Sequence, residues 1–445
     1  MNRRHFLAAG SGILAGAEAF PRKPPNIVFI LGDDLGYGDL GCYGQQKIRT
    51  PHLDRLAGEG MRFTQCYAGA PVCAPSRSVL MSGLHGGHAP IRANAGTQPL
   101  AAEDATLADL LKQRGYATGG FGKWGLGDAQ SDGVPWKHGF DTFFGYLHQV
   151  HAHSYYPDFL WDNERRFEMP KGSYSADVIF ERSLEFVRKN RDRPFFLYQC
   201  GTLPHARFEP PDVNPYSDMP WTAGQKAYAS MVTRLDTQVG LLRALLRECH
   251  LESDTLLFFT SDNGAHSGEE KGFEFFRSNG RLRGEKGQLY EGGLRVPMIA
   301  QWKGRIRPGT ASDVPCSFCD VLPTLAQAAA TGIPEGIDGV SLLPVLRGEK
   351  PPPDRYLYWE NDAWIAGTRQ LDESRLGQAA RWGKWKAIRH RPEAPLELYD
   401  LAADPGETAD VSGAHPDIGA SMETFLRKAR RVPRPHNLGD MQFIK

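Results

Sequence analysis

Two hydrophobic patterns alternate along the chain. Short apolar runs rich in β-branched and aromatic residues predict strands that are buried on both faces, as in a parallel sheet. Longer stretches with apolar residues every three or four positions predict amphipathic helices. We expect strands at 26–31, 62–67, 116–121, 194–200, 255–260 and 296–302, and helices from about 50 and at 104–114, 175–190 and 224–249. This alternation predicts an α/β fold with one large, mostly parallel mixed sheet flanked by helices.

The pattern changes in two places. Residues 128–174 show little periodicity but many aromatic and histidine residues, which predicts a functional loop or lid. Beyond about residue 350, three consecutive prolines indicate a linker. The elements expected after this linker are strands at 356–360, 382–390 and 396–399 and a helix near 417–430. These changes predict a main domain over 20–350 and a smaller C-terminal α+β domain over 351–445.

The first 19 residues have the composition of an export signal. Arg3 and Arg4 form a twin-arginine start, residues 8–17 are small and apolar, and Ala17-Glu18-Ala19 fits a cleavage site. The apolar run is too short to span a bilayer, which requires about 20 residues. We therefore predict a twin-arginine export signal over 1–19 and a periplasmic or secreted protein without a membrane span.

Composition argues against several kinds of partner. The chain has 445 residues, and its 52 lysines and arginines equal its 52 aspartates and glutamates. This balance favours neither nucleic acid nor a membrane surface, so an anionic substrate would need a local cluster of positive side chains. The seven cysteines are too few and too scattered for a disulfide framework. Cys316 and Cys319 are expected to form a local disulfide or simply to pack, and not to bind zinc.

Polar side chains directly follow several of the predicted strands. In a parallel sheet the carboxyl ends of the strands meet at one edge, where ligands bind. The residues at these ends are Asp33, Asp34, Lys123, His205, Asp262 and Asn263. The three carboxylates and one amide form an oxygen-only set that suits Ca²⁺, or less readily Mg²⁺, rather than zinc. The alternative for Asp33 and Asp34 is an exposed turn, which the glycines that follow also favour.

Residues 71–83 place a cysteine and an arginine at the start of a predicted short helix. Backbone N–H groups and the positive end of the helix dipole favour an anion near Cys73. Arg77 follows one turn later and can direct its guanidinium to the same point. Taken alone, Cys73 is better explained as a buried packing residue. The charged residues at the strand ends favour instead a nucleophile that faces an oxyanion pocket.

Several segments, which run almost from end to end of the chain, match one known family. They are Gly32-Asp-Asp-Leu-Gly-Tyr-Gly-Asp39, Cys73-Ala-Pro-Ser-Arg77, Gly122-Lys-Trp124, Pro204-His205, Ser261-Asp-Asn-Gly264, Leu282-Arg-Gly-Glu-Lys286 and Glu291-Gly-Gly-Leu-Arg-Val-Pro297. In this order they make the sequence resemble the type I, formylglycine-dependent sulfatases of the alkaline phosphatase-like superfamily. The Cys-x-Pro-Ser-Arg segment is the most specific of these matches.

The resemblance implies a sulfuric ester hydrolase that removes sulfate from a sulfated carbohydrate. By similarity, a formylglycine-generating maturation enzyme oxidises Cys73, and the hydrated aldehyde is the nucleophile. The implied ligands of a bound Ca²⁺ are Asp33, Asp34, Asp262 and Asn263. The implied catalytic residues are Cys73, Arg77, Lys123, His205 and Lys286. Among these, the two lysines would contact sulfate oxygens and His205 would help to protonate the leaving alcohol.

At one position the sequence departs from the family pattern. The family commonly has a histidine two residues after the lysine that corresponds to Lys123, where the histidine assists the nucleophile. This chain has Gly125 at that position. We expect either that His151 or His153 supplies the missing group or that turnover is slower. Both histidines are equally well explained as surface or packing residues of a long loop. The His-x-His-x-Tyr-Tyr-Pro text around them resembles bacterial sulfatases that act on sulfated galactose or N-acetylgalactosamine units.

Two other functions fit the same residues. A phosphonate or phosphate ester hydrolase on the same scaffold would be distinguished by the ester that it turns over. A non-catalytic binder of sulfated glycans would keep Cys73 unconverted, and Gly125 would then mark a decayed site.

Overall fold

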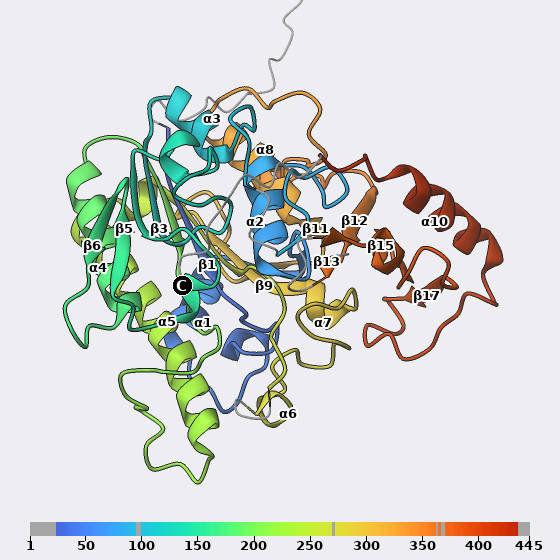
Figure 1. Cartoon of the computed structure of the whole chain (residues 1–445), viewed down its shortest axis with the longest axis horizontal. Helices are drawn as coiled ribbons and strands as arrows, with labels where there is room; N and C mark the ends of the chain where they lie inside the picture. Colours follow the sequence, from blue (N-terminus) through green and yellow to red (C-terminus); the bar gives the residue numbers. More distant parts are fainter. Residues whose placement is uncertain (1–23, 95–98, 269–271, 362–363, 366–369, 435–445) are drawn as a thin grey trace, which may run out of the picture.

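The computed structural model describes residues 24–94, 99–268, 272–361, 364–365 and 370–434, so the predicted export signal lies outside the described residues. Its centre is an eleven-stranded sheet in the order β10-β2-β9-β8-β1-β7-β3-β4-β5-β6, with β11 beside β2 (Figure 1). The strands are β1 (Asn26–Gly32), β2 (Met61–Tyr67), β3 (Ala117–Lys123), β4 (Thr142–Tyr146), β5 (Phe159–Asp162), β6 (Arg165–Glu168), β7 (Phe195–Cys200), β8 (Thr255–Ser261), β9 (Arg295–Gln301), β10 (Thr310–Ser312) and β11 (Cys316–Ser317). Strands β8, β1, β7, β3 and β4 are parallel, whereas β9, β5 and β6 are antiparallel to their neighbours. The predicted α/β class with a large, mostly parallel mixed sheet is confirmed.

Helices cover both faces of this sheet. They are α1 (Pro51–Glu59), α2 (Cys73–Ser82), α3 (Leu107–Gln113), α4 (Ser175–Asn190), α5 (Ala223–Glu248), α6 (Phe273–Phe276), α7 (Glu291–Leu294), α8 (Val321–Ala328) and α9 (Leu343–Leu346). Alternate residues of β1 enter different cores: Ile27 and Phe29 pack in the core that includes α2, α3 and α8, and Val28 and Ile30 pack in the core that includes α1, α4 and α5. A strand buried on both faces has no polar face, which explains its continuous apolar sequence.

The segment predicted to be irregular, 128–174, contains part of the sheet. Strand β4 pairs in parallel with β3, and β5 and β6 form a hairpin that continues the sheet beyond β4. These strands are only four or five residues long, and Gly145 interrupts the β4 sequence. Such short segments give too weak a periodic signal to be recognised. The residues between β4 and β5, which include His151 and His153, do form a loop with one turn of 3₁₀ helix.

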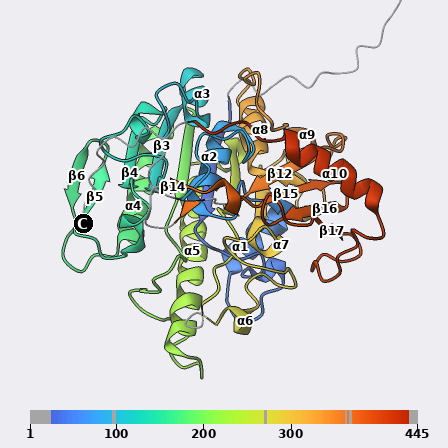
Figure 2. The same ribbon diagram turned by 45° about the vertical axis from the view of Figure 1, so that its right-hand side comes forward.

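A second, smaller sheet follows the main one along the chain (Figure 2). It contains the antiparallel strands β12 (Tyr356–Glu360), β15 (Gln378–Trp382), β16 (Trp385–Arg389) and β17 (Glu397–Asp400), and α10 (Pro416–Lys428) packs on it; β13 (Trp364–Ile365) and β14 (Gln370–Leu371) form a separate pair. The expected strand at 382–390 is wrong at its start. Trp382 ends β15, and a turn with Gly383 at a φ of 56° leads into β16. The division into domains at residue 350 stays a prediction.

A buried ion cluster joins the two sheets. Lys386 Nζ of β16 lies 2.9 Å from Glu291 Oε1 at the start of α7 and 2.8 Å from Glu407 Oε1. All three side chains are fully buried. Arg295 Nη1 also lies 3.2 Å from Glu291 Oε2, so Glu291 has two cationic partners. Burial, together with the charge of Glu291, raises the pKa of Glu407 to about 7.

The cysteines and the surface agree with the composition. All seven cysteines are free, and Cys316 and Cys319 are buried, so these two pack rather than form a disulfide.

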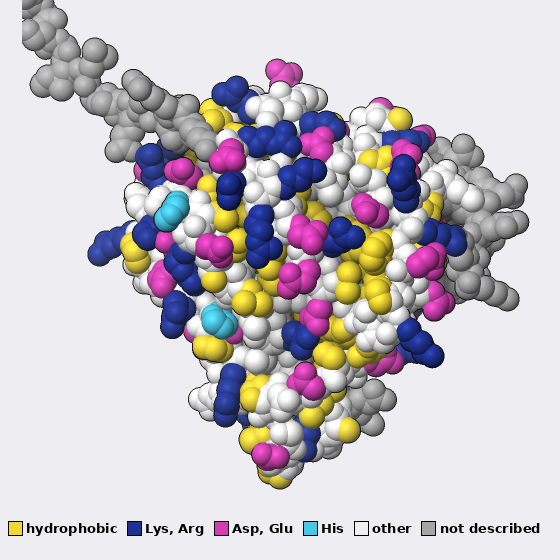
Figure 3. All heavy atoms as spheres, turned by 90° about the vertical axis from the view of Figure 1, so that its left-hand side faces the viewer, with side chains coloured by type: hydrophobic (Ala, Val, Ile, Leu, Met, Phe, Trp, Pro, Cys, Tyr) yellow, Lys and Arg dark blue, Asp and Glu magenta, His cyan; other side chains and the backbone are white. Residues whose placement is uncertain are grey.

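Figure 3 shows positive and negative side chains interspersed over the face that carries β6 and α4. No helix in the described part of the chain has both the length and the apolar character needed to cross a membrane.

Candidate active site

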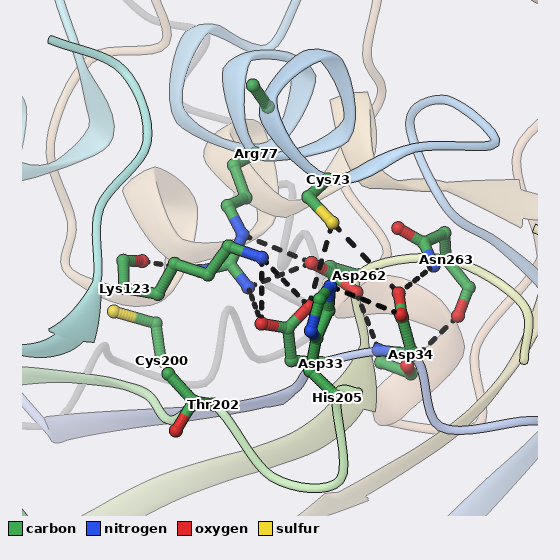
Figure 4. A network of polar contacts seen from close by, with 12 residues as sticks. Asp33, Asp34, Cys73, Arg77, Lys123, Cys200, Thr202, His205, Asp262 and Asn263 are labelled. Carbon is green, nitrogen blue, oxygen red and sulfur yellow. Dashed lines mark hydrogen bonds and ion pairs between the residues drawn. The ribbon is translucent and has the colours of Figure 1, made fainter. Parts of the chain in front are cut away.

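The predicted strand-end residues meet at the carboxyl edge of the central sheet, next to the first turn of α2 (Figure 4). They are Asp33 and Asp34 after β1, Lys123 at the end of β3, His205 after β7, and Asp262 and Asn263 after β8. All six are buried. Since β1 lies between β7 and β8 in the sheet, residues that are more than 220 positions apart become neighbours.

Cys73 is the first residue of α2 and points toward the two aspartates. Its Sγ lies 3.6 Å from Asp33 Oδ1 and 4.0 Å from Asp34 Oδ1. Burial, together with the negative charge of Asp262, raises the pKa of the Cys73 thiol to about 12. At neutral pH the unmodified residue is therefore a thiol, which is a poor nucleophile.

The four oxygen-bearing side chains predicted as metal ligands converge. Ligand atoms of Asp33 and Asp34, with those of Cys73 and His205, all lie within 4.8 Å of one another, and Asp262 and Asn263 adjoin this group through Asp34. Asp34 has a left-handed backbone with a φ of 62°, and its N–H donates to Asp262 Oδ1 at 3.2 Å. Asn263 Nδ2 donates to Asp34 Oδ1 at 2.8 Å.

The fourth of these side chains carries a further indication of a cation. Asn263 is fully buried, yet its Oδ1 has no hydrogen-bond partner. A buried polar atom without a partner is rare and calls for an explanation. Three carboxylates and this free amide oxygen are the donor set of a hard divalent cation such as Ca²⁺. The residues present therefore fit the ion that the sequence predicted.

Arg77 is directed differently from the sequence-based expectation. Its Nε and Nη2 donate to Asp262 Oδ2 at 3.1 and 2.8 Å, and its Nη1 donates to the carbonyl of Lys123. The guanidinium thus joins α2 to the ends of β8 and β3, and does not point only at the space in front of Cys73. It is fully buried, so its charge acts on the site without screening by water.

Two lysines and a neutral histidine surround the aspartate pair. Lys123 Nζ lies 2.9 Å from Asp33 Oδ2, and Lys286 Nζ lies 2.8 Å from Asp34 Oδ2. His205 Nε2 lies 3.3 Å from Lys286 Nζ and 3.4 Å from Asp34 Oδ2. Burial lowers the pKa of His205 to about 3, so the ring is neutral at neutral pH. Its Nδ1 contacts the carbonyl of Ala206, which places the ring proton on Nδ1 and leaves Nε2 as an acceptor for Lys286.

The structure separates the two candidate histidines of the loop. His153 is exposed and stacks on His205 with ring centroids 4.5 Å apart, so it lies at the mouth of the site. His151 packs between the rings of Tyr146 and Phe159, at 5.0 and 4.6 Å. We interpret His151 as a packing residue.

Sequence reasoning missed two polar residues. The Oδ1 atom of Asn94 accepts the N–H of Ala74 at 3.1 Å and so holds the first turn of α2. Gln149 is buried beside Gly125. For Asn94 the sequence holds no signal that we can identify, whereas Gln149 lies at the start of the histidine-rich segment.

Comparisons with known proteins agree with this arrangement. The family described as Sulfatase matches residues 25–332, and the family described as N-sulphoglucosamine sulphohydrolase, C-terminal, matches residues 284–431. Human arylsulfatase A is 33% identical over 96% of this chain and 91% of its own length. N-acetylgalactosamine-6-sulfatase from Canis lupus familiaris is 34% identical over 92% of this chain and 84% of its own length.

This chain is also similar in fold to a solved structure. The protein Ps i-CgsB, crystallised in complex with k-i-k-neocarrahexaose, is similar with a TM-score of 0.81 and 28% identity, over 91% of this chain and 92% of that one. The family matches, the relatives above 30% identity and the shared fold agree along most of the chain. The chain belongs to the sulfatase family of the alkaline phosphatase-like superfamily and is an enzyme of the sulfuric ester hydrolase class.

Proposed function

We propose that the enzyme removes sulfate from a sulfated carbohydrate, with residue 73 acting as formylglycine and with Ca²⁺ bound by Asp33, Asp34, Asp262 and Asn263. The observation that carries this proposal is the position of Cys73. Its side chain lies near the carboxylates of Asp33 and Asp34, among Arg77, Lys123 and Lys286, whose charges balance those of Asp33, Asp34 and Asp262. A bound divalent cation would then make the site positive and suited to an anion.

Conversion of residue 73 explains how a site with an unreactive thiol can be catalytic. The pKa of Cys73 is raised to about 12, so thiolate attack is disfavoured at neutral pH. A hydrated aldehyde at this position would supply a geminal diol, of which one hydroxyl attacks sulfur and the other allows sulfate to leave. A divalent cation held by the four proposed ligand side chains would supply positive charge beside the attacking hydroxyl.

The chain's own cations are placed to hold a sulfate group. Lys123 and Lys286 approach from two sides of the aspartate pair, 2.9 and 2.8 Å from Asp33 and Asp34. Both ammonium groups are buried or nearly so, at 1% and 13% exposure of the side chain. Positive groups that are already fixed in a site shielded from water stabilise developing negative charge without reorganisation.

We assign the protonation of the leaving alcohol to Lys286 and His205. The Lys286 ammonium can donate to His205 Nε2 over 3.3 Å. The imidazole is neutral before reaction and does not by itself carry a second proton to give. The charge of Asp34 raises the pKa of Lys286, so the proton stays on the lysine and not on His205. The Lys286 ammonium would therefore donate its proton directly to the departing oxygen, and neutral His205 would hold the ammonium in place.

A sulfated carbohydrate is the substrate class that the comparisons support best. One relative is named for N-acetylgalactosamine, and the solved structure at 28% identity holds a saccharide. At the mouth of the site, His153 is exposed and stacks on His205, and its ring could contact a sugar. A steryl-sulfatase from Mus musculus is 31% identical, so the saccharide assignment rests on these features and not on family membership.

The proposal includes a maturation step and export. A formylglycine-generating enzyme would have to act on Cys73 before folding, because the folded thiol is only 1% exposed. A twin-arginine signal carries folded proteins, so conversion would precede export to the periplasm or the medium.

The test is sulfate release from defined sulfated galactose and N-acetylgalactosamine saccharides, using protein whose conversion at residue 73 is verified by peptide mass spectrometry. We expect release by the converted enzyme and none by Cys73→Ala. Cys66→Ala, which removes a buried thiol from the core, is the matched control and should retain activity. Unchanged release by Cys73→Ala would reject the proposal. Faster turnover of the corresponding phosphate esters would favour a phosphate or phosphonate ester hydrolase, and saccharide binding without turnover by converted protein would favour a binder.

A further inference from the structure

The space in front of Gly125 is filled by another residue. A Cβ atom placed on Gly125 would lie 2.0 Å from Gln149 Nε2 and 2.9 Å from Gln149 Cδ, well inside van der Waals contact. Gly125 also has a φ of +75°, a conformation that glycine adopts without strain. A side chain at position 125 and the present position of Gln149 therefore exclude each other.

Gln149 has the features of a side chain that serves a ligand. It is only 6% exposed, yet neither its Nε2 nor its Oε1 has a hydrogen-bond partner. Leaving a buried amide unpaired costs about 1–3 kcal/mol, so such a group is retained where something else binds it. Apolar packing alone would be better served by leucine or methionine.

Gln149 is close along the chain, and at Gly125 also in space, to segments that carry active-site residues. Gly125 comes two residues after Lys123, and its N–H donates to the carbonyl of Leu147 at 3.0 Å, which brings the residues after β4 to the end of β3. Four residues after Gln149, His153 stacks on His205. The amide therefore lies against the backbone that directly follows Lys123, on the segment that leads to His153.

We propose that Gln149 is a positioning residue for the sulfate group: its Nε2 amide donates a hydrogen bond to a sulfate oxygen, from the space that a side chain at position 125 would occupy. This inference rests on the proposed function. A carboxamide does not take up a proton near neutral pH, so Gln149 orients the anion and does not replace a base. Proton transfer is then left to the Lys286 ammonium, which neutral His205 contacts.

The experiment measures binding of inorganic sulfate by calorimetry, with Ca²⁺ present and residue 73 left as cysteine, so that no turnover is needed. We expect Gln149→Ala to weaken sulfate binding by about tenfold or more, as for loss of one hydrogen bond to a charged group. Gln149→Glu, of nearly the same shape but negative, should weaken it further. Gln238→Ala is the matched control, since Gln238 is a buried glutamine of α5 whose Nε2 bonds Ala176.

Two readouts separate this inference from the proposed function. In converted enzyme, Gln149→Ala should raise KM and the inhibition constant of sulfate together, with an unchanged pH profile, because no titrating group is lost. Equal sulfate affinity in wild type and Gln149→Ala, or no sulfate binding by wild type, overturns the inference. Sulfate binding that depends on Gln149 in an enzyme that releases no sulfate from any saccharide would instead overturn the proposed function.

Discussion

The guanidinium of Arg77 donates two hydrogen bonds to one oxygen of Asp262, at 3.1 and 2.8 Å, although the residues are 185 positions apart in the chain. Both side chains are fully buried. This pair fixes the start of α2, and therefore residue 73, over the end of β8. It also places a positive charge beside the predicted metal ligands.

Removing one partner of this pair should be severe. Arg77→Gln leaves the Asp262 carboxylate buried beside Asp33 and Asp34, and we expect a loss of about 3–5 kcal/mol in stability, together with loss of activity. Thermal unfolding with and without Ca²⁺ measures the effect. The double variant Arg77→Gln with Asp262→Asn should recover part of this stability, since no unpaired charge remains. Additive losses in the double variant would show that the two residues do not act as a pair.

The predicted cation site gives a second prediction. Chelation should abolish activity and lower the thermal midpoint, and Ca²⁺ should restore both, because an ion that binds the folded protein and not the unfolded chain stabilises the fold. Asn263→Ala should weaken Ca²⁺ binding by about tenfold, since it removes the amide oxygen that has no protein partner. Asn190→Ala is the control: this buried asparagine bonds Phe186 within α4, so its loss should lower stability without changing Ca²⁺ affinity. Equal Ca²⁺ affinities in all three proteins would contradict the assignment.

The loop histidines can be tested as a matched pair. His153→Ala should raise KM about fivefold, as for loss of one contact at the mouth of the site, with little change in the thermal midpoint. His151→Ala should lower the thermal midpoint and leave KM unchanged, because its ring packs between Tyr146 and Phe159. A rise in KM for His151→Ala would show that our separation of the two residues is wrong.

These residues also show what sequence alone can predict. Asp33, Lys123 and Asp262 are recognisable because each follows an apolar strand, and the geometry of parallel sheets then brings them together. That Arg77 pairs with Asp262 is not recognisable in this way, since the direction of the Arg77 side chain depends on how α2 packs against β8. Gln149 gives no periodic signal, and its closeness to Gly125 follows from the pairing of β3 with β4, a strand too short to be predicted.

The ion cluster between the sheets predicts a pH dependence of stability. The pKa of Glu407 is raised from an ordinary value of 4.5 to about 7, chiefly by burial. The folded protein therefore keeps this proton between about pH 4.5 and 7, where the unfolded chain has lost it, and stability falls as pH rises through that range. Glu407→Gln removes the effect, so its thermal midpoint relative to wild type should rise between pH 5 and pH 8. The exposed Glu393→Gln should show no such trend. A constant difference for Glu407→Gln across this range would argue against a proton shared in the cluster.

Gly125 allows the role of Gln149 to be tested without changing Gln149 itself. In Gly125→Ala the new Cβ would lie 2.0 Å from Gln149 Nε2, so the amide must move away, and the φ of +75° adds strain of about 1–2 kcal/mol. We expect both a lower thermal midpoint and weaker binding of inorganic sulfate. Gly115→Ala separates the two effects, because Gly115 has a φ of +88° but no atom within 4 Å of its Cβ position. It should show the same strain with unchanged sulfate affinity. If both variants bind sulfate as wild type does, the position of the Gln149 amide has no effect on sulfate binding, which contradicts the inference.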